Sequence, residues 1–431
     1  MRSMLLTTLA GWLARVLAMA VNVVGMPIVL HSLGTTRFGI MLISLSIGSW
    51  IGLGNAGFGR VVALITARYY RRSPAFVSSV VTHIASISAR FYVALFFVFS
   101  TAFLLFTPWI NLGADGARYA LEFIIGTVLV FFSMSLWFFL AVFEGIDAGR
   151  HELFRLYWFQ VLAYAITLVL MFTLFAWMPS LTFAIWLVSS GFIIGNLMHA
   201  IDVWRRHRAL FRSTAKPRPA MIRSVLYNSV DFTIISIAIS IIFQFTTGIV
   251  GLMVGPDEII NLGVFMRIMA SVGGIILTVT VPMSNLIAGR LAHQDRTGAV
   301  KVAIWTGAGL LLSVGLAAVT FDIFGERLVS MWLRTPVAYE PAFRILASTL
   351  IFLTAVYAYA SGLAIGFGKL RHVARVHIGL GAAVLPLAYG CFHSQGQAGI
   401  LLAIDIVLFG GATACLLPGW KFVDLRYARE T

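Results

Sequence analysis

The stretch RRHRALFRSTAKPRPAMIR, residues 205–223, decides how this chain of 431 residues is organised. It holds seven basic residues and two prolines, whereas the sequence on either side is a nearly unbroken series of apolar segments. Basic stretches that contain proline form connections rather than regular helices. Residues 205–223 therefore predict a polar linker between two apolar halves.

The apolar segments on both sides of the linker have the length of membrane spans. Apolar residues make up 60% of the chain and charged residues only 11%, which excludes a soluble globular protein. A membrane-spanning helix needs about 20 apolar residues. We predict spans at 9–31, 38–66, 84–111, 119–143, 155–178, 181–203, 225–254, 259–288, 300–322, 343–366, 372–393 and 396–419. The stretches at 38–66 and 259–288 are long enough to be tilted or broken.

These twelve spans predict an all-α, polytopic integral membrane protein built as two six-helix lobes. The stretch MPIVLHSLGTTRFGIMLIS (26–44) is echoed by GIVGLMVGPDEIINLGVFMRIMA (248–270), which indicates an internal repeat. Because six is even, both lobes begin on the same side and would be related by a pseudo-twofold axis along the membrane normal, with a cavity between them. This organisation is typical of transporters. The expected parts are an N-terminal lobe at 1–204, a cytoplasmic linker at 205–223, a C-terminal lobe at 224–421 and a cytoplasmic tail at 422–431.

The basic residues orient the chain. With the N-terminus inside, 22 of the 31 lysines and arginines fall in cytoplasmic segments, five fall outside and four lie within spans. Cytoplasmic loops carry the positive excess, so both termini are predicted to be cytoplasmic. The net charge of +15 then reflects topology and contact with anionic membrane lipids, and it gives no reason to expect a nucleic-acid partner.

Three stretches carry a family resemblance. PIVLHSLGTTRFGIMLISLSIGSWIGLGNAGFGRVV (27–62), YNSVDFTIIS (227–236) and VPMSNLIAGRLAHQD (281–295) resemble the polysaccharide transporter family, the Wzx-type O-antigen flippases, of the multidrug/oligosaccharidyl-lipid/polysaccharide exporter (MOP) superfamily. The resemblance implies a flippase in the bacterial inner membrane that moves an undecaprenyl-pyrophosphate-linked oligosaccharide for O-antigen or exopolysaccharide biosynthesis. It also implies polymerase and glycosyltransferase partners of the same pathway.

Four arginines inside spans are the candidate site residues: Arg15, Arg60, Arg90 and Arg267. A charge within the membrane is costly unless the protein uses it, and arginine binds phosphate oxygens through two parallel hydrogen bonds. We expect these arginines to line a cavity that binds the pyrophosphate headgroup, helped by Asn22 and Asn285. For Arg15, Arg90 and Arg267, the alternative is that the side chain snorkels to the interface. For Arg60, the alternative is a buried pair with a carboxylate.

Two carboxylates inside spans, Asp231 and Asp405, have two possible roles. Each either couples transport to H⁺ or Na⁺, or pairs with one of the arginines. Structural pairing is the simpler role of the two.

Other patterns carry no chemistry. Gly52, Gly54 and Gly57 match a dinucleotide motif but lie in an apolar span with no strand before it. We expect no cofactor and no metal, and we interpret Cys391 and Cys415 as packing residues.

The rival functions are a multidrug exporter, a lipid II flippase and a membrane polysaccharide polymerase or ligase. Such an enzyme would need a site in the longest external connection, about 323–342, which offers Glu326, Arg327, Arg334 and Glu340.

Overall fold

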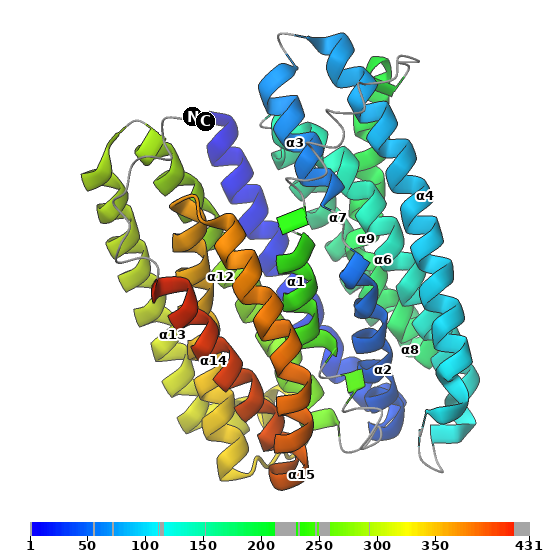
Figure 1. Ribbon diagram of the computed structural model, residues 1–431. Helices are drawn as coiled ribbons and strands as arrows, with labels where there is room; N and C mark the ends of the chain where they lie inside the picture. Colours follow the sequence, from blue (N-terminus) through cyan, green and yellow to red (C-terminus); the bar gives the residue numbers. More distant parts are fainter. Residues whose placement is uncertain are drawn as a thin grey trace. The chain divides into compact units, whose positions relative to one another are not determined.

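The computed structural model describes residues 2–54, 57–70, 73–110, 112, 116–150, 152–211, 230–231, 233–245, 248–249, 259–292 and 294–417. Over these residues the chain is helical (Figure 1). It divides into two compact units, the first made of Met1–Ser240 and Thr247–Gly263 and the second of Ile241–Thr246 and Val264–Thr431. The predicted division at 205–223 is not tested by these units, and most of that linker and the tail at 422–431 lie outside the described residues.

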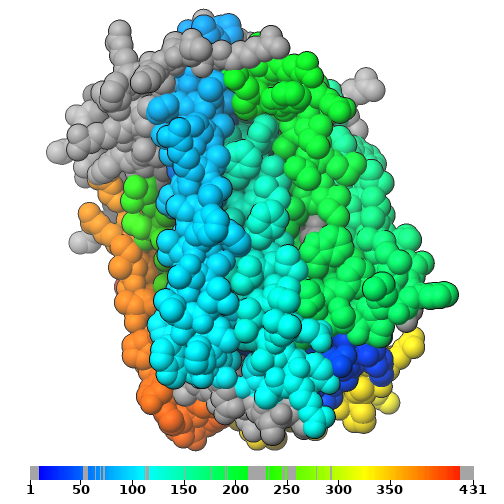
Figure 2. Space-filling view, turned by 90° about the vertical axis from the view of Figure 1, so that its right-hand side faces the viewer, coloured from blue at the N-terminus to red at the C-terminus, as the bar shows by residue number. Residues whose placement is uncertain are grey.

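The first unit is built mainly from seven helices whose apolar sequences predicted them. They are α1 (Arg2–Leu33), α2 (Thr35–Gly48), α3 (Phe58–Tyr69), α4 (Pro74–Phe106), α6 (Ala120–Gly149), α7 (Phe154–Phe172) and α9 (Leu181–Arg206). Short elements join them: η1 (Ser49–Gly54), η2 (Thr107–Trp109), η3 (Ala117–Tyr119), α8 (Leu174–Trp177) and η4 (Arg208–Phe211). In Figure 2, α4 runs along the surface of this unit, where Phe97, Val98 and Leu105 are exposed. Exposed apolar side chains along a whole helix are what a lipid-facing surface requires.

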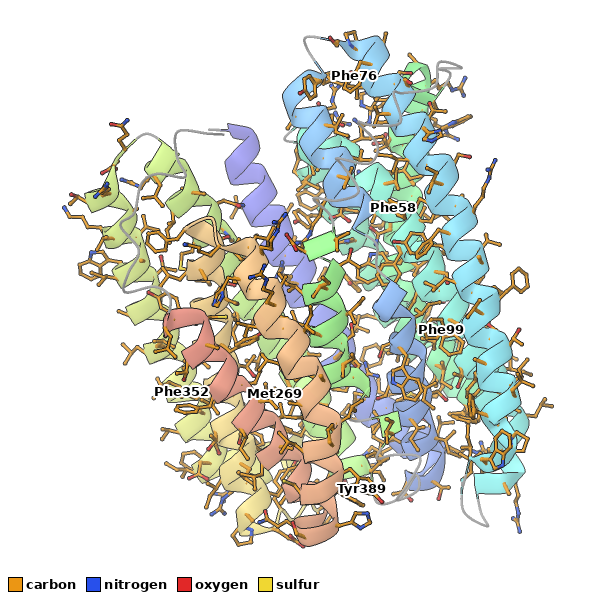
Figure 3. The ribbon with its side chains drawn as sticks, viewed as in Figure 1. Phe58, Phe76, Phe99, Met269, Phe352 and Tyr389 are labelled. Atoms are coloured by element: carbon orange, nitrogen blue, oxygen red, sulfur yellow. The ribbon has the colours of Figure 1, made fainter. Side chains whose placement is uncertain are left out.

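The predicted span at 38–66 is broken. Helix α2 ends at Gly48, a 3₁₀ turn follows, and α3 begins at Phe58 after Gly57. Gly57 has φ 63°, a left-handed conformation that glycine adopts without steric cost. Phe58 (Figure 3) then packs edge-on against Tyr92 of α4, with 6.0 Å between ring centroids, and Tyr92 stacks on Phe138 of α6. The break thus lets α3 leave the line of α2 and join the core.

Helices α3 and α6 approach each other very closely. A Cβ atom at Gly145 would collide with the backbone oxygen of Gly59, and one at Gly149 would lie 2.6 Å from the oxygen of Ala63. Ala141, Gly145 and Gly149 repeat every four residues, so they form one smooth strip on α6. Small residues at this spacing allow helix backbones to touch within a membrane.

The second unit contains α12 (Ile260–Ala292), α13 (Arg296–Leu333), α14 (Pro341–Gly366), α15 (Leu370–Leu416) and the π-helical turn η5 (Ile241–Phe245). Met283 and Ile287 of α12 form a buried cluster with Ala299 and Ala303 of α13. In Figure 3, Met269 lies inside this unit, whereas Phe352 and Tyr389 lie on its surface. The side chain of Asp295 caps α13 by accepting from the Gly298 N–H at 2.8 Å, and this hydrogen bond and the charge of Arg290 lower the pKa of Asp295.

α15 is a helical hairpin rather than one rod. Gly396 has φ 58° and ψ −138°, which interrupts the helix. His372, near the start of α15, has its Nε2 3.0 Å from the carbonyl oxygen of Ala414, near the end. The two halves therefore run antiparallel, as the separate spans predicted at 372–393 and 396–419 require.

Each of the twelve predicted spans overlaps a described helix. Among the described residues, eight helices are long and apolar enough to cross a membrane, and α9, bent by 45°, makes up to nine. The remaining predicted spans correspond to the broken α2–α3 segment, the shorter helix Thr233–Gln244 and the second half of α15. The chain is thus a multi-pass membrane protein with an all-helical fold. The span at 259–288, which was long enough to be broken, is the continuous helix α12.

The prediction of a long external connection at 323–342 was wrong. Helix α13 continues to Leu333 and α14 begins at Pro341, so only residues 334–340 form the loop. Glu326 lies in α13 and accepts a hydrogen bond from the Tyr339 N–H at 3.2 Å, which ties the loop down. The feature that could have held an enzyme site is therefore mostly helix.

Candidate functional site

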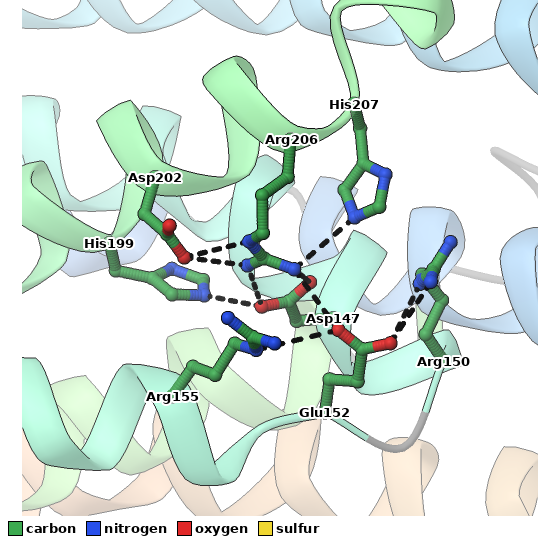
Figure 4. Close-up of polar contacts among 8 residues, drawn as sticks. All are labelled: Asp147, Arg150, Glu152, Arg155, His199, Asp202, Arg206 and His207. Atoms are coloured by element: carbon green, nitrogen blue, oxygen red, sulfur yellow. Dashed lines mark hydrogen bonds and ion pairs between the residues drawn. The ribbon is translucent and has the colours of Figure 1, made fainter.

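An ionic network at one end of the first unit holds three helices together (Figure 4). Its centre is Asp147, near the end of α6, whose side chain is completely buried. His199, Asp202 and Arg206 are spaced by three and four residues and so share one face of α9. That face turns two partners, His199 and Arg206, toward Asp147.

The contacts of Asp147 satisfy its charge. His199 donates from Nε2 to Oδ2 at 3.0 Å, and Arg206 donates from Nη2 to the same oxygen at 2.8 Å. Arg206 also donates from Nε to Oδ2 of Asp202 at 2.8 Å. A buried carboxylate is tolerated only when it is paired and hydrogen-bonded in this way.

Glu152, in the connection between α6 and α7, extends the network. It accepts from Arg206 Nη1 at 3.0 Å and from Arg150 Nη2 at 3.0 Å, and Arg155 of α7 lies 3.6 Å away. Arg150 in turn covers the ring of Tyr70, at the end of α3, 4.4 Å from its centroid. The ionic network therefore joins α6, α7 and α9, and through Tyr70 it also reaches the end of α3. It lies at the end of the unit that the charge distribution predicts to be cytoplasmic.

The network does not fit a metal. Asp147, Glu152 and His207 place one ligand atom each within 4.8 Å of one another. The guanidinium of Arg206, however, already bridges Asp147 and Glu152 and would repel a cation. Burial, together with the charges of Arg150 and Arg206, lowers the pKa of His207, which leaves its ring neutral and able to accept from Arg206 Nη1 at 3.3 Å.

Arg60 lies beside a carboxylate. Its guanidinium, on α3, is within electrostatic range of Glu144 on α6, and Glu144 also interacts with His199. The close approach of Gly59 to Gly145 puts these two neighbouring side chains together. The headgroup contact and the carboxylate pair both stay predictions for Arg60.

The other two span arginines of the first unit, Arg15 and Arg90, lie in different surroundings. Arg15 of α1 is half-buried and interacts with Tyr157 and Tyr164 of α7, and Glu144 interacts with the same Tyr157. Arg90 is exposed on α4, on the face opposite Ser88 and Tyr92, which are buried. Arg90 shares its face with the exposed Val93 and Phe97, so its placement favours snorkelling from a lipid-facing surface.

Arg267 lies in α12 of the second unit and is half-buried. No residue that the structure describes forms an ion pair or a hydrogen bond with its guanidinium; the helical contact near it is the Ser271 hydroxyl, which donates to the Arg267 carbonyl at 3.3 Å. A Cβ atom at Gly274, two turns along the same face, would meet nothing within 4 Å. Arg267 thus lies within a helix long enough to cross a membrane, on a face that is open at Gly274.

The other expected site residues are dispersed. Asn22 donates to the carbonyl of Ala18 in its own helix at 3.1 Å, Asn285 is exposed on α12, and Asp231 is half-buried. Asp405 is buried in the second half of α15. The structure does not bring these side chains into one cluster within either unit.

The sequence alone did not predict the ionic network, because the fourth predicted span ends at residue 143. Helix α6 continues to Gly149, so Glu144 and Asp147 lie inside it. The signal was present: two acidic residues three apart, with Gly145 and Gly149 on the same helix. His199 in the sixth span offered the matching partner.

Comparison with known proteins identifies the fold. No family model matches the chain, and no curated protein matches it in sequence. An inward-facing multidrug resistance MATE family transporter of the MOP superfamily is similar in structure, with a TM-score of 0.76 and 15% identity over 97% of this chain and 96% of that one.

Two further structures agree. The eukaryotic MATE transporter AtDTX14 has a TM-score of 0.71 at 16% identity, over 100% of this chain and 98% of that one. A MOP superfamily transporter from Pyrococcus furiosus, described as having a binding pocket of reverse polarity, has a TM-score of 0.69 at 13% identity, over 100% and 96%. The chain therefore has the fold of MOP superfamily transporters.

Proposed function

We propose that this protein is a flippase that moves an undecaprenyl-pyrophosphate-linked oligosaccharide repeat unit across a bacterial inner membrane, by alternating access of a cation-lined cavity. The transport would serve O-antigen or exopolysaccharide biosynthesis. The observation that carries the proposal is Arg267, a cation inside a span for which no described residue supplies a counter-charge.

The chemistry of Arg267 selects an anionic substrate. Arginine stays charged in proteins, and a charge within the membrane is costly unless it meets an opposite charge or water. A pyrophosphate offers several oxygens in the geometry that a guanidinium binds with two parallel hydrogen bonds. Two turns further along the same face of α12, a Cβ atom at Gly274 would meet nothing within 4 Å.

The fold supports a transporter but does not choose the substrate. The pocket polarity that is reported for the Pyrococcus furiosus transporter suggests a different function within the same superfamily. The charge of the side chains inside the spans is therefore the better guide to the substrate. Arg267 is a positive charge, which favours an anionic substrate.

A multidrug exporter is the second candidate. Several similar structures are multidrug transporters, and Glu144 and Asp405 supply carboxylates within helices that could attract a cationic drug. In the first unit, Glu144 offsets part of the positive charge of Arg60. The two functions predict opposite signs of substrate, which makes them separable.

The test is a depletion strain in which the leaflet of the lipid-linked oligosaccharide is assayed by access of an enzyme added from the periplasmic side. Depletion should leave complete repeat units on the cytoplasmic side. Complementation with Arg267→Ala should restore transport poorly, because a hydrogen bond to a charged group contributes about 1.5–3 kcal/mol, or roughly 10- to 100-fold. The matched control is Arg90→Ala, which removes a span arginine from an exposed face and should complement fully.

The outcomes distinguish the candidates. Unchanged oligosaccharide distribution on depletion, with increased sensitivity to cationic drugs, would favour the exporter. Repeat units that reach the periplasm but remain unpolymerised or unligated would indicate a polymerase or ligase.

A further inference from the structure

The exposed side of α9, at its basic end, carries apolar, aromatic and cationic side chains in that order. Leu197 and Ile201 lie on this side with 42% and 45% of their surfaces exposed, and Trp204 follows with 46% exposed. Arg205, in the last turn of α9, and Arg208, at the start of η4, are exposed as well. Residues spaced by three and four share one face of a helix, so these five side chains form one surface, the α9 terminal surface.

The order of side chains along this surface matches the layers of a membrane. The sixth predicted span ends at residue 203, so Trp204 lies at its boundary, where tryptophan is enriched in membrane proteins. Leu197 and Ile201 lie toward the middle of the span, at the level of acyl chains. Arg205 and Arg208 lie beyond it, at the level of lipid headgroups.

Arg205 and Arg208 lack a carboxylate partner. Asp147, Glu152 and Asp202 of the ionic network all pair with the intervening Arg206. No residue that the structure describes forms an ion pair with the two outer arginines, and the sequence from 203 to 230 contains no acidic residue. The two guanidinium groups are therefore available to an external anion.

Arg208 is held in place by contacts on both sides of it. Its guanidinium lies over the ring of Trp204, 4.7 Å from the centroid. The hydroxyls of Ser78 and Thr82 on α4 donate to two consecutive carbonyls of η4, each at 2.9 Å. Figure 2 shows this end of α9 at the top of the unit, beside the start of α4. A side chain that is ordered before binding loses less conformational freedom when it binds a ligand.

From this arrangement we propose that the α9 terminal surface binds an anionic phospholipid of the surrounding leaflet. Arg205 and Arg208 hold the phosphate, and an acyl chain lies along Leu197 and Ile201. Arginine binds phosphate oxygens through parallel hydrogen bonds, and basic residues at a membrane surface attract anionic lipids. This lipid is a resident of the membrane and not the transported molecule, so the proposal does not depend on the substrate of the protein.

A local role for the two arginines makes a different prediction. Basic residues near the C-terminus of a helix stabilise it by opposing the helix dipole. That effect needs no lipid, so it would lower the stability of arginine variants in detergent alone. Lipid binding instead predicts that the variants keep their stability in detergent and lose the response to anionic lipid.

Thermal unfolding of the purified full chain in a neutral detergent tests the proposal, with dioleoylphosphatidylglycerol as the probe. This lipid should raise the melting temperature of the wild type more than dioleoylphosphatidylcholine, because a ligand of the folded state stabilises it. Arg205→Gln/Arg208→Gln should melt like the wild type without lipid. It should need roughly 10- to 30-fold more phosphatidylglycerol for half of the maximal effect. Trp204→Leu, which removes the ring beneath Arg208, should give a smaller change in the same direction.

The matched control is Arg118→Gln/Arg327→Gln, which removes two exposed positive charges from other parts of the chain and should keep the wild-type response. Glycerol 3-phosphate, the soluble headgroup without acyl chains, should not stabilise the protein.

The proposal is overturned by equal stabilisation by the two lipids, by equal loss of response in the two double variants, or by stabilisation with glycerol 3-phosphate alone. Lower stability of Arg205→Gln/Arg208→Gln in detergent, with an unchanged lipid response, would assign the arginines to the helix dipole and also overturn it. None of these measurements uses the oligosaccharide, so the flippase proposal and this one can fail independently.

Discussion

At the scale of the residue, the span arginines separate by their surroundings rather than by their depth in the sequence. Arg60 has Glu144 within electrostatic range, Arg15 has two tyrosines within electrostatic range, and Arg90 lies on an exposed face. Arg267 has no counter-charge among the described residues. A cation whose charge is already balanced gains less from binding an anion than one that is not, which is why Arg267 carries the functional proposal.

Arg206 is expected to be a major source of stability for the first unit. Replacing it with alanine leaves the buried carboxylate of Asp147 with His199 alone, and loss of one partner of a buried pair costs about 3–5 kcal/mol. We predict a clear drop in the melting temperature of Arg206→Ala in detergent. Arg205→Ala, an exposed neighbour on α9, should melt like the wild type.

A second substitution tests the cause of this effect. Asp147→Asn, introduced into the Arg206→Ala variant, removes the unbalanced charge and should restore part of the lost stability. If the double variant melts below Arg206→Ala, the loss would come from packing rather than from the charge of Asp147.

At the scale of the element, the strip of small residues on α6 positions the ionic groups. Ala141, Gly145 and Gly149 let α3 come close enough for Arg60 to interact with Glu144. The following turn of α6 carries Asp147 to α9. Packing and electrostatics therefore depend on the same helix face.

Gly145→Ala should separate α3 from α6. The added Cβ collides with a backbone oxygen of Gly59, which cannot rotate away, so the helices must move apart. We predict a loss of about 1–3 kcal/mol, the range found for overpacking, measured as a lower melting temperature. The control is Gly379→Ala in α15, where a Cβ would meet nothing within 4 Å and where better helix propensity should leave stability equal or higher by about 1 kcal/mol. Equal melting temperatures of the two variants would show that the close contact between α3 and α6 does not contribute to stability.

At the scale of the whole molecule, the distribution of basic residues predicts the orientation of the chain in the membrane. The ionic network, with Arg150, Arg155 and Arg206, lies at the end of the first unit where the sequence concentrates basic residues. The loop at 334–340, between α13 and α14 of the second unit, falls among the segments that the sequence predicts to be external. The orientation with cytoplasmic termini stays a prediction.

Cysteine labelling can test this orientation. In a variant carrying Cys391→Ala and Cys415→Ala, Ala338→Cys in the external loop should react with a membrane-impermeant thiol reagent in cells with a permeabilised outer membrane. Thr297→Cys, exposed at the opposite end of α13, should react only after the inner membrane is disrupted. The reverse pattern would place the termini outside.

The sequence by itself determined the membrane class, the twelve apolar segments and the bias of basic residues, because hydropathy and charge are properties of local stretches. It indicated that 38–66 and 259–288 could each be tilted or broken, and the structure decided that only the first is interrupted. The structure changed several boundaries: α4 begins at Pro74 and not at 84, α6 extends to Gly149 and α13 extends to Leu333.

Only the tertiary structure decided which charges meet. Asp147 and His199 are 52 positions apart, and Asp147 and Arg206 are 59 apart, so their contact depends on how α6 packs against α9. The packing of α3 against α6 likewise brings Arg60 within electrostatic range of Glu144. In the second unit, the carboxylate oxygens of Asp405 have no hydrogen-bond partner among the described residues. The sequence gives the charge of each residue. The residue that balances this charge depends on which helices pack together, and these helices can be far apart in the sequence.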